Sequence, residues 1–338
     1  MKKIVIIGAG SMGTAFAYPC YDNKFEVNIV GTYLENNSID ELNKSHFHLG
    51  LNQEVIKSIK FFKHDSINDV FENKPDLVVI GVNSKGINWI SEELNKVSKN
   101  KELPDLLMLT KGLSINGKKY ELLVNKLKRL LLEKGIKNIN LSAVGGPCLA
   151  SGLANRVHSS VVIANKNLDT AKSLSKMLST DYYHISSSSD VVGVEVCAAI
   201  KNIFSMIIGA APGLNKIKNK DNLFLNTSAA LVKQSIYEME VFTEFLKGKK
   251  ETVKGLAGLG DLYVSAAGGR NSKMGSFIGE GIIYSEAKKT KMPNVTIEGA
   301  ELIFEIGKKV KEDFNEEKLP LMISLIDAIL EDKILKIN

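Results

Sequence analysis

The 338-residue sequence contains few of the residues that form disulfide frameworks or metal clusters. Its three cysteines, Cys20, Cys148 and Cys197, are odd in number and far apart in the chain. This excludes a disulfide framework and a CxxC metal motif, and it favours a reducing, cytoplasmic setting. Of the five histidines only His46 and His48 are close together, with no carboxylate or cysteine at ligand spacing, so we expect no metal site.

Long uninterrupted apolar runs and clusters of basic residues are also missing. The most apolar segment, near residues 203–214, is short and includes Ser205 and Pro212, so we expect no stable membrane insertion. A cleaved leader is not expected, because cleavage would remove the first predicted strand and the turn after it. The net charge of +6 comes from dispersed lysines, which predicts no nucleic-acid partner and a field that favours anionic substrates.

The length of the chain and the order of its hydrophobic patterns predict two domains, residues 1–187 and 188–338. Short β-branched runs in the first domain predict strands at residues 3–7, 27–30, 58–62, 77–82, 106–110, 141–144 and 161–164. Strands of this kind, separated by helical or loop segments, are typical of an α/β fold with a Rossmann-like, doubly wound and mainly parallel sheet.

The second domain is expected to be all-α. Residues 227–246 carry apolar side chains at three- and four-residue spacing, which predicts a helix with one buried face. The residues of that face are Val232, Ile236, Met239, Phe242 and Leu246. The serine run at residues 186–189 predicts a hinge between the domains and an N-cap region for the next helix.

The first predicted strand runs directly into Gly8-Ala9-Gly10-Ser11-Met12-Gly13, and a helical pattern follows from Thr14. The first glycine permits a tight turn, the second lets a pyrophosphate approach bare backbone at a helix N-terminus, and the third lets that helix lie close to the strand. Because a strand precedes the motif and a helix follows it, the motif favours dinucleotide binding over the alternative of an ordinary glycine-rich turn. The predicted cofactor contacts are Gly8, Gly10, Ser11, Met12 and Gly13.

The second strand ends in Val30-Gly31-Thr32. Neither the acid that would bind the adenine ribose of NAD nor the arginine expected for the 2′-phosphate of NADP stands there. We place Thr32 in the cofactor site and expect both NAD and NADP to be accepted. A slight lean to NADPH follows, because nothing negative repels the extra phosphate.

Further motifs lie in both domains: Thr110-Lys111-Gly112, Gly146-Pro147, residues 193–202, residues 255–262, Gly268-Gly269-Arg270-Asn271 and Ile297-Glu298-Gly299. In order and spacing, from residue 1 to about 305, the chain resembles the NAD(P)-dependent sn-glycerol-3-phosphate dehydrogenases. The resemblance implies reversible reduction of dihydroxyacetone phosphate to sn-glycerol 3-phosphate, which supplies the glycerophospholipid backbone. It also implies a homodimer with an active site in the cleft between the domains.

Reducing a ketone requires a hydride donor and a proton donor at the oxygen. Lys201 is the candidate proton donor, since it lies in the middle of a predicted helix among small residues. Lys111 would place a second cation near the substrate and lower the pKa of Lys201, and Asp261 would orient the pair. The alternatives are a surface lysine with a snorkelling side chain at position 201 and a turn or cap aspartate at position 261.

The sequence has only three arginines, Arg129, Arg156 and Arg270. Arg270 follows two glycines and precedes a helix expected from Lys273, and a guanidinium at a helix N-terminus suits a phosphate dianion. The alternative is a surface turn arginine. The resemblance extends the cofactor site to Lys111, Ala150, Arg270, Thr296 and Glu298, the last of which could equally be a helix-start glutamate. It places Lys111, Gly146, Cys148, Lys201, Asn202, Asp261, Ser265, Gly269, Arg270 and Asn271 at the substrate.

The chain departs from the family in two loops. Asn83 replaces the proline that follows the fourth strand, and Cys148 begins a segment that lacks the glutamate usual after the Gly-Pro pair. Two other functions are alternatives to glycerol-3-phosphate dehydrogenase activity. An opine-type or hydroxyacid dehydrogenase would not need Arg270 and Asn271, and a non-catalytic dinucleotide-binding regulator would not need the two lysines and Asp261.

Overall fold

The computed structural model describes residues 1–72, 74–98, 100, 102–215 and 224–337. The chain forms two compact units, one of residues 1–111 and 123–191 and the other of residues 112–122 and 192–338. The domain boundary predicted after residue 187 stays a prediction. The first unit runs on to Val191, and the segment Gly112–Leu122 belongs to the second.

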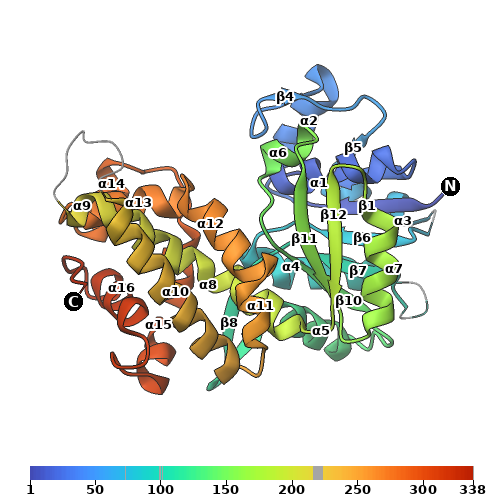
Figure 1. Cartoon of the computed structure of the whole chain (residues 1–338). Coiled ribbons are helices and arrows are strands. Elements are labelled where there is room, and N and C mark those ends of the chain that lie inside the picture. Colours follow the sequence, from blue (N-terminus) through green and yellow to red (C-terminus); the bar gives the residue numbers. More distant parts are fainter. Residues whose placement is uncertain (73, 99, 101, 216–223, 338) are drawn as a thin grey trace. The chain divides into compact units, whose positions relative to one another are not determined.

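Within the described residues, an eight-stranded sheet forms the centre of the first unit, in the order β12-β11-β10-β7-β6-β1-β2-β5 (Figure 1). From β5 to β10 the strands are parallel and follow the doubly wound order, while β11 is antiparallel to β10 and parallel to β12. The bounds are β1 (Lys3–Ile7), β2 (Glu26–Val30), β5 (Lys60–Phe62), β6 (Leu77–Ile80), β7 (Asp105–Met108), β10 (Leu141–Gly145), β11 (Ser159–Ala164) and β12 (Tyr183–Ser188). The predicted mainly parallel sheet is confirmed.

The helices of the first unit are α1 (Ser11–Asp22), α2 (Asn36–Ser45), α3 (Ile67–Glu72), α4 (Ile87–Val97), α5 (Leu123–Glu133), α6 (Ala150–Ala154) and α7 (Leu168–Leu178). Helix α1 begins three residues before the expected Thr14, with Gly10 as its N-cap. A short hairpin, β3 (Phe47–His48) and β4 (Gln53–Glu54), follows α2. The polypeptide therefore passes from β1 into α1 through the glycine-rich turn without an intervening loop.

The interpretation of residues 186–189 as a hinge is wrong. Ser186 and Ser187 lie in β12 and pair in register with Val162 and Ile163 of β11. Their hydroxyls donate to the Val161 carbonyl (3.2 Å) and to Ser175 Oγ (2.9 Å). The serine half of this edge strand is held by polar contacts and carries no hydrophobic pattern that would predict it from the sequence, whereas Tyr183 at its start is buried in the core.

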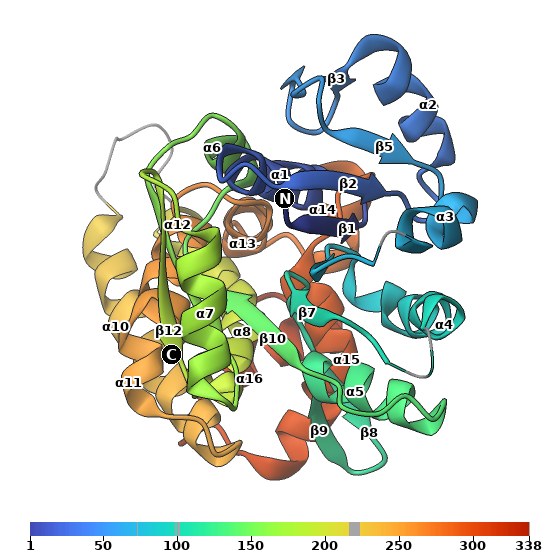
Figure 2. The same cartoon turned by 90° about the vertical axis from the view of Figure 1, so that its right-hand side faces the viewer.

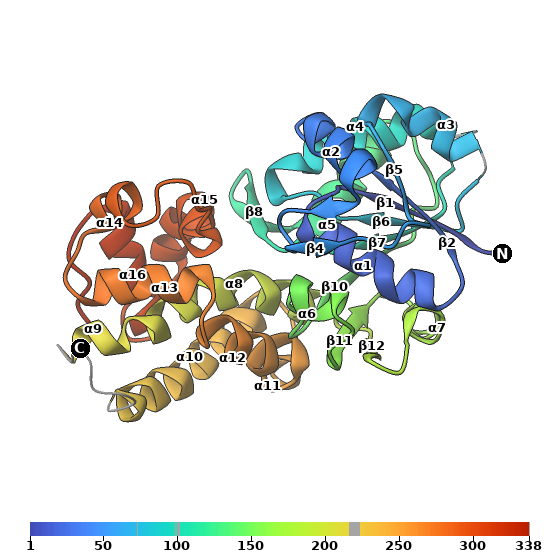
Figure 3. The same cartoon turned by 90° about the horizontal axis from the view of Figure 1, so that it is seen from above.

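In its described residues the second unit is helical apart from one hairpin, and its helices run from yellow-green α8 to red α16 in Figure 3. The helices are α8 (Val191–Gly209), α9 (Ala211–Leu214), α10 (Leu225–Phe245), α11 (Lys250–Lys254), α12 (Asp261–Ala266), α13 (Arg270–Gly279), α14 (Tyr284–Thr290), α15 (Glu298–Asp313) and α16 (Pro320–Leu330). The hairpin is β8 (Leu113–Asn116) and β9 (Lys119–Leu122). The prediction of an all-α domain missed this hairpin, which comes from a part of the chain assigned to the first domain.

The segment Val191–Leu214, which holds α8 and α9, is long and apolar enough to cross a membrane by length and composition alone. The expectation that no segment reaches that length is therefore wrong on those criteria. In the folded chain 89% of its most apolar window is buried, so packing within the protein accounts for its hydrophobicity.

Glycines allow α8 to lie in backbone contact with two other helices. A Cβ on Gly275 of α13 would lie 1.9 Å from the Met206 carbonyl oxygen, and a Cβ on Gly299 of α15 would lie 2.6 Å from the Asn202 carbonyl oxygen. No side chain fits at either position. These two close approaches fix where α13 and α15 cross α8, at Met206 and at Asn202 respectively.

The buried face of α10 differs in part from the predicted one. Met239 and Phe242 are fully buried, whereas Val232 and Ile236 are only half-buried, and Glu238 is buried in their place. Its two carboxylate oxygens accept the backbone N–H groups of Leu321 and Met322, each at 2.9 Å, in the first turn of α16. Burial raises the pKa of the Glu238 carboxyl, although these two N–H groups act in the opposite direction.

Replacing Glu238 by alanine is expected to lower the free energy of unfolding by about 2–4 kcal/mol, because two buried N–H groups at a helix start lose their acceptor. Urea unfolding of the Glu238→Ala variant measures this loss. The matched control is Glu244→Ala on the same helix, which removes an exposed ion pair with Lys250 and should cost less than about 1 kcal/mol. Equal losses in the two variants would contradict a capping role for Glu238.

Candidate functional site

The glycine-rich turn after β1 has the geometry that a dinucleotide requires. Gly8 has a φ of +112°, and a Cβ there would lie 2.8 Å from the Gly81 backbone at the end of β6. A Cβ on Gly13 would lie 2.1 Å from the Gly8 carbonyl oxygen, so this glycine lets α1 pack directly on the turn. At Gly10, by contrast, a Cβ would meet nothing within 3.8 Å. The backbone at Gly10 is therefore open to a ligand.

The position of this turn in the sheet fits the same ligand. Strand β1 lies beside β2 (Figure 2) and pairs with β6 on its other side, at the point where the doubly wound strand order reverses. Helix α1 starts at Ser11 without a side-chain cap, so its first N–H groups and its dipole favour an anion. The predicted cofactor residues Gly8, Gly10, Ser11, Met12 and Gly13 are thus brought together at one anion-binding turn.

The structure corrects the sequence-based view of the end of β2. Thr32 lies there as expected, but its backbone N–H donates to Oε2 of Glu35 at 2.7 Å. The same oxygen accepts the N–H of Ala9, in the glycine-rich turn, at 3.1 Å. A carboxylate therefore lies at the site thought to lack one, and the argument for NADPH loses its basis. Glu35 was missed because it stands three residues beyond Thr32 and returns only through a turn in the chain.

A second residue near the turn was also missed. His48 is buried, and its Nε2 lies 2.9 Å from the Ala9 carbonyl oxygen, while its Nδ1 accepts the N–H of Leu51 at 3.1 Å. Since Nδ1 is an acceptor, Nε2 carries the proton and donates to Ala9. His48 thus supports the turn. In the part of the chain that the structure describes, no group of three or more His, Cys, Asp and Glu residues could hold a metal ion.

The other predicted residues of the first unit lie at loops beyond sheet strands. Gly146 and Cys148 follow β10, and Gly146 has a φ of +127° with Val161 packed against it. Ala150 begins α6, which packs on α1. Lys111 is half-buried and follows Thr110 beyond β7. Its proposed closeness to Lys201, which belongs to the second unit, stays a prediction.

Lys201 and Asp261 form a buried ion pair in the second unit. The lysine is 7% exposed and the aspartate 2%. The Lys201 ammonium donates to Asp261 Oδ1 and, at 2.9 Å, to Ser265 Oγ. Three residues assigned from the sequence are thus joined, and Lys201 is not a snorkelling surface lysine.

The glycine-rich segment before Asp261 explains how this carboxylate reaches the lysine. Residues 256–260 form a single π-helical turn, with the Gly260 N–H donating to the Gly255 carbonyl at 3.2 Å. A Cβ on Gly258 would lie 2.0 Å from the Val253 carbonyl oxygen, so only glycine fits against α11. Asp261 then begins α12, and Ser265, four residues on, lies on the same helical face. The segment therefore serves to place Asp261.

Burial makes this ion pair informative about function. Removing two charges from water is costly, and apolar residues of similar volume often stabilise a protein as well as a buried ion pair does. A buried lysine held by one carboxylate and one hydroxyl is therefore a candidate for chemistry. An ammonium held in this way can deliver a proton to an oxygen placed within hydrogen-bonding distance.

A second polar cluster adjoins the first, because Asn202 follows Lys201 on α8. Buried Asn271 donates through Nδ2 to Asn202 Oδ1 (3.1 Å) and to Glu298 Oε2 (3.4 Å). Its Oδ1 accepts the N–H of Gly299 at 2.9 Å. Asn271 therefore links α8, α13 and the start of α15.

Arg270 lies at the first position of α13, so the helix expected from Lys273 begins three residues earlier. Its guanidinium pairs with Glu298, the first residue of α15. Neither N-cap residue caps its helix with a side chain, although Asn271 accepts the Gly299 N–H of α15, so the arginine stands beside helix-start N–H groups of α13 and α15. The arrangement suits a phosphate dianion. Gly269 is the N-cap of α13, and Thr296 is exposed just before α15.

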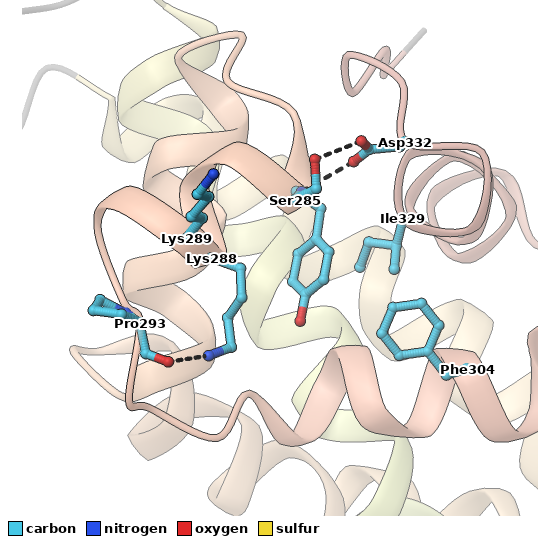
Figure 4. A pocket seen from close by; sticks show the side chains of 8 residues that line it. Ser285, Lys288, Lys289, Pro293, Phe304, Ile329 and Asp332 are labelled. Atoms are coloured by element: carbon cyan, nitrogen blue, oxygen red, sulfur yellow. Dashed lines mark hydrogen bonds between the residues drawn. The ribbon is translucent and has the colours of Figure 1, made fainter.

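A cavity of about 660 Å³ in the second unit contains none of the predicted site residues (Figure 4). Some polar groups of its wall bond within the fold: Ser285 donates to Asp332, and Lys288 donates to the carbonyls of Met292 and Pro293. The predicted site residues gather elsewhere, at the glycine-rich turn in the first unit and at the Lys201 and Arg270 clusters in the second.

Comparison with protein families gives two matches that together cover nearly the whole chain. Residues 3–171 match the model described as NAD-dependent glycerol-3-phosphate dehydrogenase N-terminus. Residues 190–336 match the model described as the C-terminus of the same enzyme. The matched segments include the glycine-rich turn, Lys111, Lys201, Asp261 and Arg270.

Individual relatives agree with the family models. The chain is 28% identical over 288 residues to the NADP(+)-dependent glycerol-3-phosphate dehydrogenase of Archaeoglobus fulgidus, covering 84% of this chain and 82% of that one. It is 30% identical over 322 residues to the glycerol-3-phosphate dehydrogenase [NAD(P)+] of Mesoplasma florum, covering 93% and 90%. The crystal structure of glycerol-3-phosphate dehydrogenase from Coxiella burnetii superposes with a TM-score of 0.81 at 25% identity, covering 98% and 96%.

Proposed function

Because the chain belongs to the NAD-dependent glycerol-3-phosphate dehydrogenase family, we propose that Lys201 is the proton donor of that reaction in this protein. The chain is an NAD(P)-dependent oxidoreductase that interconverts dihydroxyacetone phosphate and sn-glycerol 3-phosphate. The observation that carries the assignment of Lys201 is its buried ion pair with Asp261.

The chemistry divides between the cofactor and the chain. A bound nicotinamide dinucleotide supplies the hydride to the ketone carbon or accepts it in the reverse direction. The Lys201 ammonium donates a hydrogen bond and then a proton to the ketone oxygen, where negative charge develops. Asp261 and Ser265 hold the ammonium in place during this transfer. In the oxidative direction the neutral amine takes the proton back from the hydroxyl.

The phosphate of the substrate is assigned to the start of α13. Arg270 offers planar, forked donors that match phosphate oxygens, and the helix-start N–H groups add to the attraction. Asn271 positions this helix start against Asn202, the neighbour of Lys201. These contacts support a small phosphorylated ketone as the substrate. An opine-type or hydroxyacid dehydrogenase, whose substrates lack a phosphate, would not require Arg270 and Asn271.

Several properties beyond the reaction itself also remain proposals. We infer a cytoplasmic enzyme that supplies the glycerophospholipid backbone, supported by the family match and by cysteines that are odd in number and far apart in the sequence. From the resemblance alone we propose a homodimer. The dispersed lysines support the absence of a nucleic-acid partner, and the burial of Val191–Leu214 supports the absence of membrane insertion. Retention of Lys111, Lys201 and Asp261 argues against a non-catalytic regulator.

The test of the function compares two ketones. With NADH or NADPH present, dihydroxyacetone phosphate should be reduced, as followed by loss of the cofactor absorbance. Unphosphorylated dihydroxyacetone should react far more slowly, because it offers nothing to the Arg270 cluster. Equal rates for the two ketones would contradict the assigned phosphate site, and no turnover of the phosphorylated ketone would contradict the function.

A further inference from the structure

The carboxylate of Glu35 lies where the ends of β1 and β2 meet, beside the turn that would hold a dinucleotide. Its Oε2 accepts the N–H of Thr32 at 2.7 Å and the N–H of Ala9 at 3.1 Å. The two donors come from the segments that follow the two neighbouring strands, which pair in parallel from Lys3 with Glu26 to Ile7 with Val30 (Figure 2). Glu35 therefore joins the glycine-rich turn to the segment that follows β2.

The backbone of Glu35 is held as firmly as its side chain. Its N–H donates to the Thr32 carbonyl at 2.9 Å, and its own carbonyl accepts the N–H of Ile39 at 2.8 Å as α2 begins. Gly31 allows this tight return, since a Cβ there would lie 2.9 Å from the Ile39 side chain. The glutamate is thus positioned at both ends and does not have to be ordered by a ligand.

The second oxygen of this carboxylate faces the open part of the turn. Oε1 lies 3.8 Å from the position that a Cβ on Gly10 would take, and that contact is the nearest one at Gly10. One oxygen is therefore fixed by the protein, while the other lies beside Gly10. A carboxylate oxygen in that place can accept hydrogen bonds from ribose hydroxyls and repels a phosphate carried by the same ribose, whereas the pyrophosphate is attracted by the N–H groups at the start of α1.

The arginines of the first unit do not offset this negative charge. Arg129 pairs with Glu133 at 3.0 Å on α5, and Arg156 pairs with Asp22 at 2.8 Å near the end of α1. Lys63, which follows β5, pairs with Asp40 of α2 at 2.9 Å. The charged group that these hydrogen bonds place at the turn is thus an anion.

We propose that Glu35 accepts hydrogen bonds from the adenosine ribose hydroxyls of the cofactor and disfavours a 2′-phosphate, so that this chain prefers NAD(H) to NADP(H). The inference rests on the dinucleotide site of the proposed function and adds a specificity-determining residue to it. It reverses the preference suggested by Thr32 alone.

The experiment measures binding, not turnover. Isothermal titration calorimetry of the full chain with NADH and with NADPH should give a dissociation constant for NADPH at least about tenfold higher, a ratio that corresponds to roughly 1.4 kcal/mol. The variant Glu35→Gln keeps an oxygen that can accept from Ala9 and Thr32 but loses the charge. Glu35→Gln should reduce the ratio of the NADPH dissociation constant to the NADH dissociation constant by about tenfold, mainly because NADPH binds more tightly.

A matched control comes from the same helix. Glu41 is an exposed residue of α2 whose ion pair is with Lys44 of the same helix. The change Glu41→Gln therefore removes one negative charge from α2 without altering the turn. Glu41→Gln should leave the NADH to NADPH ratio unchanged. Melting temperatures of the variants, measured without cofactor, identify any loss of cofactor binding that is caused by misfolding. A further variant, Glu35→Asp, keeps the charge and should keep the preference for NADH.

Several results would overturn the proposal. NADPH binding as tight as NADH in the original chain would do so, as would equal narrowing of the ratio by Glu35→Gln and Glu41→Gln. A preference lost equally in Glu35→Asp and Glu35→Gln would assign the effect to geometry and not to charge. Because binding is measured without the substrate, a preference for NADH that depends on Glu35 would stand even if dihydroxyacetone phosphate were not reduced.

Discussion

Replacing Lys201 by alanine is expected to lower kcat for dihydroxyacetone phosphate by about 10²–10⁴-fold, because the proton donor at the ketone oxygen is lost. The ammonium also stabilises the negative charge that develops on that oxygen, so the loss belongs to the transition state. The variant also removes the ammonium that pairs with the buried Asp261 carboxylate, so a lower melting temperature is expected as well. Activity must therefore be compared at a temperature at which the variant is folded.

The measurement separates chemistry from cofactor binding. Trp89 is the single tryptophan, and its ring lies 5.8 Å from that of Tyr33, next to Thr32. Its emission can therefore report dinucleotide binding in the first unit. Lys201→Ala should bind NADH with an affinity close to that of the original chain while its turnover collapses. Near-normal turnover, or a parallel loss of binding and activity, would remove Lys201 from the proton-donor role.

Two conservative variants sharpen this test. Lys201→Arg keeps the positive charge but should not restore activity, since a guanidinium stays protonated and cannot take a proton back in the oxidative direction. Asp261→Asn keeps Lys201 and an oxygen acceptor but loses the negative partner. It should reduce kcat and change the pH profile of kcat, an effect that a purely structural role for Asp261 would not produce.

Replacing Arg270 by alanine should reduce kcat/KM for the phosphorylated ketone by an amount equivalent to about 2–4 kcal/mol, because one or two charge-assisted hydrogen bonds are lost. Turnover of unphosphorylated dihydroxyacetone should change little. Stability should also change little, since the Arg270 side chain is 59% exposed and its ion pair with Glu298 is largely solvated. Steady-state rates with the two ketones, side by side, measure this selectivity.

Two further variants complete the comparison for Arg270. Arg270→Lys keeps the charge but not the fork and should recover only part of the loss. Arg129→Ala removes another arginine that pairs with a glutamate, on α5 of the first unit, and should leave both ketones unaffected. If Arg270→Ala had the kcat/KM of the original chain for the phosphorylated ketone, the phosphate would have to bind elsewhere.

The sequence by itself determined the parts of the protein whose signal is local. The seven strands predicted in the first domain are all present, because β-branched runs between glycine and polar segments favour strands. The dinucleotide turn could also be predicted, because its glycines stand between a strand pattern and a helix pattern. In the structure Gly8 and Gly13 meet backbone atoms that no side chain could approach. Lys201 and Arg270 could be named because a lone lysine in an apolar helix and a rare arginine after two glycines are unusual.

Only the tertiary structure decided which of these residues meet. Lys201 and Asp261 are 60 residues apart, and the π-helical turn that aims the aspartate depends on glycine contact with α11. Glu35 returns to the turn only through the first turn of α2, and Glu238 caps a helix that begins more than 80 residues later. The second half of β12 carried no apolar pattern, because its serines bond to neighbouring groups. The physical reason is common to all four. Hydropathy and glycine placement act within a few residues, whereas a hydrogen bond between distant residues depends on where helices and strands cross, and those crossings are set by backbone contacts that no local pattern encodes.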